Sequence, residues 1–174
     1  VAALTASGLP TEEFYFVGFL PHKSGQRRKQ LESLTAQTAT LVLYEAPYRW
    51  SPDASVIDVN LAVSHEYAAD GLSMTLKFRE GVKWSDGEPC TVDDVLFWWN
   101  DLVLNTDFPD QPPDFGQAGG ELVEMIKVDD YTLKLKYVAP APLTAKRLAM
   151  WVNAGVGPRW IAPKHYLQQF HPTY

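Results

Sequence analysis

Apolar and polar residues alternate along two stretches of the chain, at 74–84 and at 126–137. The apolar positions are Met74, Leu76, Phe78, Val82 and Trp84 in the first stretch, and Ile126, Val128, Leu133, Leu135 and Tyr137 in the second. A period of two places one set of side chains on one face of a sheet, which is typical of half-buried strands. Asp70-Gly71, Glu80-Gly81 and Asp129-Asp130 supply turn residues, so two antiparallel hairpins are expected.

A different spacing follows the first hairpin. Apolar residues recur every three or four positions at Val92, Val95, Leu96, Trp99, Leu102 and Val103, with Phe97 and Trp98 beside that stripe. This spacing predicts a helix that begins at Val92 and packs Trp99 into a core. Thr91 is a suitable N-cap, and Asp94 can complete a capping box with it. Residues 105–120 are rich in Pro, Asp and Gly and predict a mobile surface loop, while short helices are expected near 143–151 and 163–170.

The first 49 residues follow a third pattern. An aromatic run at 14–19 and an apolar run at 40–44 predict strands, and Leu31 and Leu34 give the intervening helix an apolar stripe. Such a β-α-β unit is expected to bury its helix on the sheet and to leave the basic turn 22–29 exposed. The fold class predicted for the whole chain is therefore α+β: antiparallel hairpins with packed helices, preceded by a β-α-β fragment.

Composition and charge narrow the classes of protein. A chain of 174 residues with 46% hydrophobic and 13% aromatic residues can bury a core and is not disordered. Residues 1–49 contain five Lys or Arg and four Glu, a net charge of +1 within a total of −6. An acidic chain disfavours a general nucleic-acid surface, so RNA contact is expected to be local at most.

The sequence has few features that indicate a disulfide, a membrane span or a signal peptide. Cys90 is the single cysteine, which excludes an intrachain disulfide. No apolar run reaches the roughly 20 residues of a membrane span. The first residues, Val-Ala-Ala-Leu, lack the pattern of a signal peptide, so the chain as written is expected to be cytoplasmic.

Motifs that would carry chemistry are absent from the sequence. The acidic pairs Asp93-Asp94 and Asp129-Asp130 stand where a helix cap and a turn need short acceptors. The four histidines, His22, His65, His165 and His171, show no zinc-ligand spacing, and no nucleophile or phosphate-loop signature occurs. We therefore expect no catalytic residue, no metal and no cofactor.

Short sequence motifs in residues 1–49 carry a resemblance to a known family. They are Gly18-Phe19-Leu20-Pro21, Lys23, Arg27-Arg28, Leu31, Leu41 to Pro47 and Arg49. This stretch resembles the middle of the small-subunit rRNA ribose 2′-O-methyltransferases of the tetrapyrrole-methylase superfamily. The resemblance implies that Lys23, Arg27 and Arg28 face RNA phosphates. Tyr48 replaces the histidine usual in that family, and the Gly-rich methyl-donor loops are absent, so no S-adenosylmethionine pocket is expected.

A denser resemblance covers residues 50–174. Its words are Asn60-Leu61-Ala62, Asp70-Gly71-Leu72, Leu76 to Pro89, Thr91, Asp93-Asp94-Val95, Phe97, Ala162 to Leu167 and Phe170-His171-Pro172. They resemble the peptide and nickel solute-binding proteins of family 5, the oligopeptide class. The signature positions expected to serve structure are Gly81, Trp84, Asp86, Gly87, Thr91 and Asp94.

The two patterns meet within residues 44–50, where Tyr-Glu-Ala-Pro-Tyr-Arg fits both families. We therefore expect two domains, a methyltransferase-like fragment at 1–49 and a solute-binding-like fragment at 50–174. A chimeric origin by design, recombination or misassembly is the hypothesis that this junction suggests.

The larger resemblance implies peptide binding between two lobes and delivery to an ABC permease from the periplasm. Its matching segment corresponds largely to the accessory domain of the first lobe, so most of the cleft is expected to be missing and binding to be weak or absent. The alternatives are an RNA-contacting methyltransferase remnant and a purely structural chimera.

Overall fold

The computed structural model describes residues 12–18, 20–21, 23–43, 48–50, 57–107, 112–149, 160–172 and 174. The contacts divide the chain into two compact units, Val1–Glu45 and Ala46–Tyr174. Most of the predicted junction, residues 44–47, lies outside the described residues, as do His22 and Phe19. The origin of the two units stays a prediction.

The first unit is a parallel β-α-β unit, as the sequence predicts. It consists of β1 (Phe14–Gly18), α2 (Ser24–Leu34) and β2 (Thr40–Leu43). The helix is buried much less than expected, because Leu34 is buried but Leu31 is 41% exposed. The expectation that Leu31 belongs to a buried stripe is therefore wrong. The other residues of α2 are mainly polar, so a single leucine near its C-terminal end reaches the interior.

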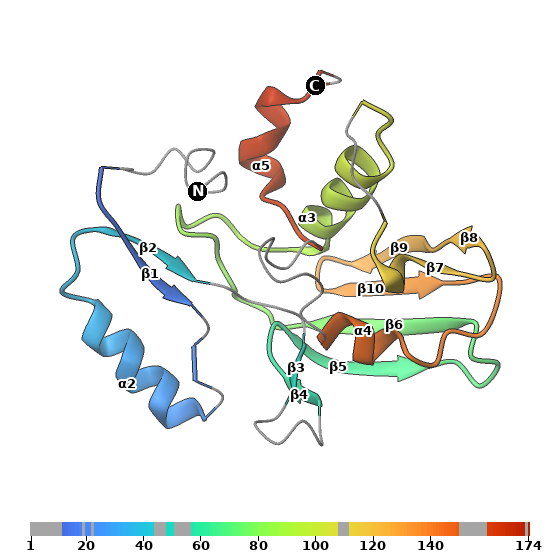
Figure 1. Cartoon of the computed structure of the whole chain (residues 1–174), viewed down its shortest axis with the longest axis horizontal. Coiled ribbons are helices and arrows are strands. Elements are labelled where there is room, and N and C mark those ends of the chain that lie inside the picture. The colour runs from blue at the N-terminus through green and yellow to red at the C-terminus, as the bar shows by residue number, and fades with distance from the viewer. Residues whose placement is uncertain are drawn as a thin grey trace. The chain divides into compact units, whose positions relative to one another are not determined.

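The second unit is built on a four-stranded antiparallel sheet in the order β5-β6-β10-β9 (Figure 1). Its strands are β5 (Ala62–Tyr67), β6 (Ser73–Phe78), β10 (Thr132–Lys136) and β9 (Glu124–Asp129). The central strands β6 and β10 join the two hairpins, with Leu76 opposite Leu133 and Met74 opposite Leu135. All four of these side chains are buried, which confirms the alternation read from the sequence.

Three apolar positions, Val82, Trp84 and Val128, behave differently from the prediction. Val128 is 59% exposed and lies at a β-bulge, where the register shifts between the pairs Lys127–Leu133 and Asp129–Thr132. Val82 and Trp84 do not continue a strand, since Lys83 forms only an isolated bridge with Pro89. Residues 81–89 form a compact loop instead, with left-handed backbone at Gly81 (φ 76°) and Gly87 (φ 94°), which favours glycine at both positions.

The predicted helix begins at Val92, but its hydrogen bonding changes from the α-helical to the π-helical pattern after Phe97. α3 (Val92–Phe97) continues directly into a π-helix, η1 (Trp98–Val103). Phe97, Trp98 and Trp99 are all buried, so the apolar stripe is wider than a regular α-helix would give. The C-terminal helix α5 (Lys164–Leu167) and the 3-10 turn η3 (Gln168–Phe170) follow, and α5 lies beside α3 (Figure 1).

The predicted mobile loop at 105–120 is partly a core element, so that expectation is wrong for its described second half. The 3-10 turn η2 (Asp114–Gly116) buries Phe115 against Trp98. It leads into the short hairpin of β7 (Gln117–Ala118) and β8 (Glu121–Leu122). The Tyr137 hydroxyl donates a hydrogen bond to the Phe115 carbonyl (2.8 Å) and fixes the turn to the end of β10. Residues 108–111 lie outside the described part.

The remaining elements complete the second unit. β3 (Tyr48–Trp50) pairs with β4 (Ile57–Val59). The helix α4 (Thr144–Ala149) lies within the helix predicted at 143–151, and the last two residues of that range are not described. The Tyr67 hydroxyl connects α4 to the sheet, because it accepts from the Ala145 amide (3.0 Å) and donates to the Pro142 carbonyl (3.2 Å). None of the described helices combines the length and apolarity that crossing a bilayer requires.

Candidate functional site

The signature residues meet around the N-terminus of α3. Thr91 caps the helix with its hydroxyl, which accepts from the Asp93 amide (3.3 Å). Asp94 completes the capping box, since its Oδ2 accepts from the Thr91 amide (2.9 Å). Both halves of the predicted capping box are confirmed.

The Asp94 carboxylate also reaches two segments distant in sequence. Its Oδ2 accepts a second hydrogen bond from the Trp84 indole N–H (3.1 Å), and its Oδ1 accepts from the Lys164 backbone amide (2.9 Å). The side chain is buried, with 4% exposed. Burial of a carboxylate is expensive unless hydrogen bonds compensate for lost water, and here three donors do so. We call Trp84, Thr91, Asp94 and Lys164 the Asp94 cluster.

A second carboxylate lies at the solvent-facing side of the same region. Asp86 Oδ2 and His165 Nε2 are 2.6 Å apart, and Asp86 Oδ1 accepts from the Glu88 amide (3.2 Å). These hydrogen bonds, that of His165 first, lower the pKa of Asp86 below its ordinary value of 3.8. The pair ties α5 to the 81–89 loop at a second point, 79 residues away in sequence.

Cys90 lies beside this cluster as an inert group. Burial, with the nearby charge of Asp94 as a smaller cause, raises the pKa of its thiol to about 12. A thiol with that pKa remains protonated at neutral pH and is a poor nucleophile or metal ligand. Among the described residues no group of three or more potential metal ligands comes together.

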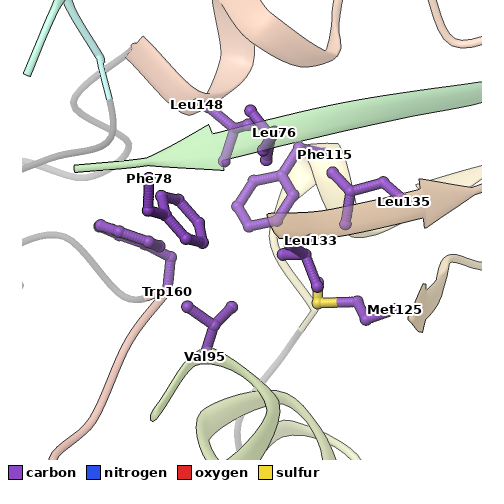
Figure 2. A pocket seen from close by; sticks show the side chains of 9 residues that line it. All are labelled: Leu76, Phe78, Val95, Phe115, Met125, Leu133, Leu135, Leu148 and Trp160. Atoms are coloured by element: carbon purple, nitrogen blue, oxygen red, sulfur yellow. The ribbon is translucent and has the colours of Figure 1, made fainter. Parts of the chain in front are cut away.

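A small void lies in the described core and is shown in Figure 2. Nine side chains from both central strands, β9, α3, η2, α4 and Trp160 converge on it: Leu76, Phe78, Val95, Phe115, Met125, Leu133, Leu135, Leu148 and Trp160. Its volume is about 10 Å³, at the lower limit of about 10–15 Å³ that one water needs. Ligand pockets measure roughly 300–1,000 Å³, so this void is a packing defect and not a binding site.

The basic residues of the first unit are partly engaged within the protein. Arg27 Nε donates to the Pro21 carbonyl (3.1 Å), and Arg28 Nε pairs with Glu32 Oε1 (2.8 Å) one helical turn away. Lys23 is exposed at the start of α2. The structure therefore does not gather the three predicted RNA-contacting residues into one unengaged group, and their contact with RNA stays a prediction.

Sequence reasoning identified Trp84, Thr91 and Asp94 but missed two residues that bond to the signature carboxylates, Lys164 at Asp94 and His165 at Asp86. Lys164 contributes through its backbone amide, and no side-chain pattern can indicate that. His165 could have been found, because it lies within the C-terminal signature motif and its imidazole can form a hydrogen bond with a carboxylate.

Comparison with solved structures defines the class of protein. The fold matches a periplasmic binding protein, MelB of Agrobacterium fabrum C58 in complex with stachyose, with a TM-score of 0.60 and 30% identity over 75% of this chain and 20% of that one. It also matches the oligopeptide-binding protein OppA, with a TM-score of 0.63 and 27% identity over 99% of this chain and 28% of that one. The class is thus that of substrate-binding proteins.

The family follows from the sequence match. Residues 57–169 match the bacterial extracellular solute-binding proteins, family 5 Middle, and the chain belongs to that family. The periplasmic α-galactoside-binding protein of Rhizobium meliloti strain 1021 is 34% identical over 115 residues, which are 66% of this chain. The chain spans only 16% of that protein's length.

A second similarity accompanies the first, as the sequence predicted. The ribosomal RNA small subunit methyltransferase I of Pseudomonas aeruginosa is 49% identical over 49 residues, which are 28% of this chain and 17% of that protein. The chain therefore carries segments similar to two unrelated classes of protein.

Proposed function

We propose that residues 57–169 form a non-catalytic supporting segment of an extracytoplasmic solute-binding protein that delivers its ligand to an ABC permease. One observation carries this proposal: the family's signature residues are engaged with one another. Asp94 receives three internal hydrogen bonds, and Asp86 is paired with His165. Polar groups satisfied in this way build a scaffold and have little capacity left for a solute.

Similar proteins suggest two chemical classes of ligand to test for the whole protein. One similar protein is named for α-galactosides and another was solved with stachyose, while a third is named for oligopeptides. We propose that the present chain binds neither class tightly, because its signature carboxylates are bonded internally and the void in its described core, about 10 Å³, is far below ligand size. This proposal includes the peptide binding that the family resemblance implies.

Titration calorimetry tests the proposal with two ligand arms, a mixed di- to pentapeptide library and stachyose. The Agrobacterium stachyose-binding protein serves as the positive control for the second arm. We expect no saturable heat from this chain at ligand concentrations of about 100 µM. Saturable heat with a Kd near or below about 10 µM in either arm would overturn the proposal and identify the ligand class.

The second candidate is an RNA-contacting remnant, which the methyltransferase similarity favours. We expect RNA retention by the chain to be weak, since Arg27 and Arg28 already have internal partners. The test compares retention on immobilised rRNA at low and high salt for the chain, for Arg27→Ala/Arg28→Ala and for Lys134→Ala/Lys136→Ala as control. Salt-sensitive retention that only the arginine variant loses would favour the remnant over the solute-binding scaffold.

The chimeric origin remains our hypothesis for the joining of the two segments. Its support is the coexistence of two similarities, each to a part of a longer protein. A family of natural genes that encode both segments in the same order would contradict it.

A further inference from the structure

The C-terminal segment 160–172 is held to the rest of the second unit without strand pairing. It contains α5 and η3, and none of its described residues belongs to a described sheet. α5 lies beside α3 (Figure 1). A strand inside a sheet is held by a ladder of backbone hydrogen bonds, whereas this segment depends on a few separate contacts. We call residues 160–172 the strap.

Two carboxyl-bearing residues anchor the first half of the strap. The Lys164 amide donates to Asp94 Oδ1 (2.9 Å), and the Ala162 amide donates to the Asp94 carbonyl oxygen (3.3 Å). On the solvent side, His165 Nε2 lies 2.6 Å from Asp86 Oδ2. The inner anchor is buried and the outer anchor is partly exposed. Loss of both would free the strap from α3 and from the 81–89 loop.

The end of the strap is held by the same helix. His171 Nε2 lies 3.1 Å from the Asp101 carbonyl oxygen of η1, and the His171 ring meets the Phe97 ring edge-on, with centroids 6.2 Å apart. These contacts and the inner anchor all lie on the continuous helix formed by α3 and η1. The strap can therefore leave this helix without rearrangement of the four-stranded sheet.

Trp160 carries an unpaired donor at the start of the strap. Its side chain is 5% exposed and packs against Phe78, with ring centroids 5.9 Å apart. The indole Nε1 is buried and finds no acceptor among the described residues. A buried N–H group without an acceptor costs free energy, because it has lost water and gained no partner. Trp160 also borders the void of the core (Figure 2), so its packing is incomplete on that side.

Trp84 provides a contrast within the same region. Its indole N–H donates to Asp94 Oδ2 (3.1 Å) and so supports the carboxylate that anchors the strap. The same chemical group therefore stabilises the closed arrangement at Trp84 and destabilises it at Trp160.

We propose that the strap opens and closes as one unit, held shut by Asp94 and Asp86 and biased toward opening by the unpaired indole of Trp160. In the open state water hydrates the Trp160 N–H, and Phe78 is uncovered. The strap is thus a conformational device within the second unit. It adds a moving part to the scaffold and does not depend on which solute the whole protein binds.

Native-state hydrogen exchange of the full chain, resolved to single amides by NMR, tests the strap. The Lys164 amide donates to Asp94, and the Leu167 amide donates to the Pro163 carbonyl oxygen (2.9 Å). We expect both amides to exchange through one common opening. Its equilibrium constant should exceed that of the protected amides in β6 and β10 by about tenfold or more.

An isosteric replacement tests the role of the unpaired donor. Benzothiophene has nearly the shape of indole but no N–H, so Trp160→3-benzothienylalanine is expected to lower the opening constant of both amides about tenfold. The matched control is Trp84→3-benzothienylalanine, which removes a donor to Asp94 and is expected to raise the opening constant about tenfold. The two replacements should therefore act in opposite directions.

Asp86→Asn tests the outer anchor and remains informative should the replacement at Trp84 unfold the unit. It is expected to raise the opening constants of the Lys164 and Leu167 amides by the same factor, about two- to fivefold, since the lost pair is partly exposed. Faster or unchanged exchange after the replacement at Trp160 would overturn the proposal. Separate opening constants for the two amides, or strap amides as protected as those of β6 and β10, would overturn it as well.

Discussion

At the scale of single residues, Asp94 decides how the second unit is held together. Its two oxygens accept from the Trp84 indole, the Thr91 amide and the Lys164 amide, which belong to three separate segments. The sequence predicted the cap at Thr91 because the motif is local. It could not predict Lys164, since a backbone amide 70 residues away leaves no mark in the pattern of side chains.

Asp94→Asn is expected to reduce the free energy of unfolding by about 2–4 kcal/mol. An amide presents one oxygen, so its NH₂ group must face a donor on the other side of the cluster. Urea unfolding followed by tryptophan fluorescence measures the loss. Asp93→Asn is the matched control, because Asp93 is exposed and bonded to Lys127, and it should cost less than about 1 kcal/mol. Equal costs for the two variants would show that the Asp94 cluster is not a main support.

Asp86 gives the protein a pH dependence of defined sign. Its folded-state pKa is lowered, first by the hydrogen bond with His165. The resulting stability is present above the ordinary pKa of 3.8 and is lost as the pH falls through the lower folded value.

Asp86→Asn should therefore be less stable than the parent chain at pH 5–6, and the difference should shrink below about pH 3.8. Urea unfolding across this range measures it. In a His165→Gln background the same substitution should cost less, since the first cause of the shift is gone. A difference between parent and Asp86→Asn that grows on acidification would contradict this assignment.

At the scale of elements, the predicted helix illustrates what periodicity shows and what it omits. The start at Val92 and the burial of Trp99 were predictable from the cap and from the spacing of apolar residues. The π-helix from Trp98 to Val103 was not, because its wider turn depends on neighbours in space. One such neighbour is the 3-10 turn at Asp114–Gly116, which the composition of its segment had marked as a mobile loop.

Gly116 allows this close packing. A Cβ atom at that position would lie 2.8 Å from Cη2 and 2.9 Å from Cζ3 of Trp99. Gly116→Ala is therefore expected to cost about 1–3 kcal/mol through forced displacement of the indole. Gly25→Ala in α2 is the control, because a Cβ atom at Gly25 would meet nothing within 4 Å. This substitution should leave stability unchanged or raise it slightly, since alanine favours a helix more than glycine does. Urea unfolding of both variants tests the difference, and an unchanged midpoint for Gly116→Ala would contradict the packing argument.

At the scale of the whole molecule, the α+β class and the local hairpins were readable from the sequence. The pairing of β6 with β10 was not, because alternation identifies the buried face of a strand but not its neighbour. Trp84, Thr91 and Asp94 belong to the motifs that carry the resemblance of the larger part, and in the structure Trp84 and Thr91 both donate to the Asp94 carboxylate.

The central claim is that the second unit is a scaffold whose signature residues support its own core. Hydrogen exchange along the full chain tests this claim most directly. We predict the slowest exchange in β6, β10 and the first turn of α3. We predict fast exchange in β1 and β2, because few of the described side chains in their unit are buried. Asp94→Asn should speed exchange in α3 and α5 and leave exchange in β1 as it is in the parent chain. Equal protection of both units, or an Asp94→Asn variant that exchanges like the parent chain, would contradict the claim.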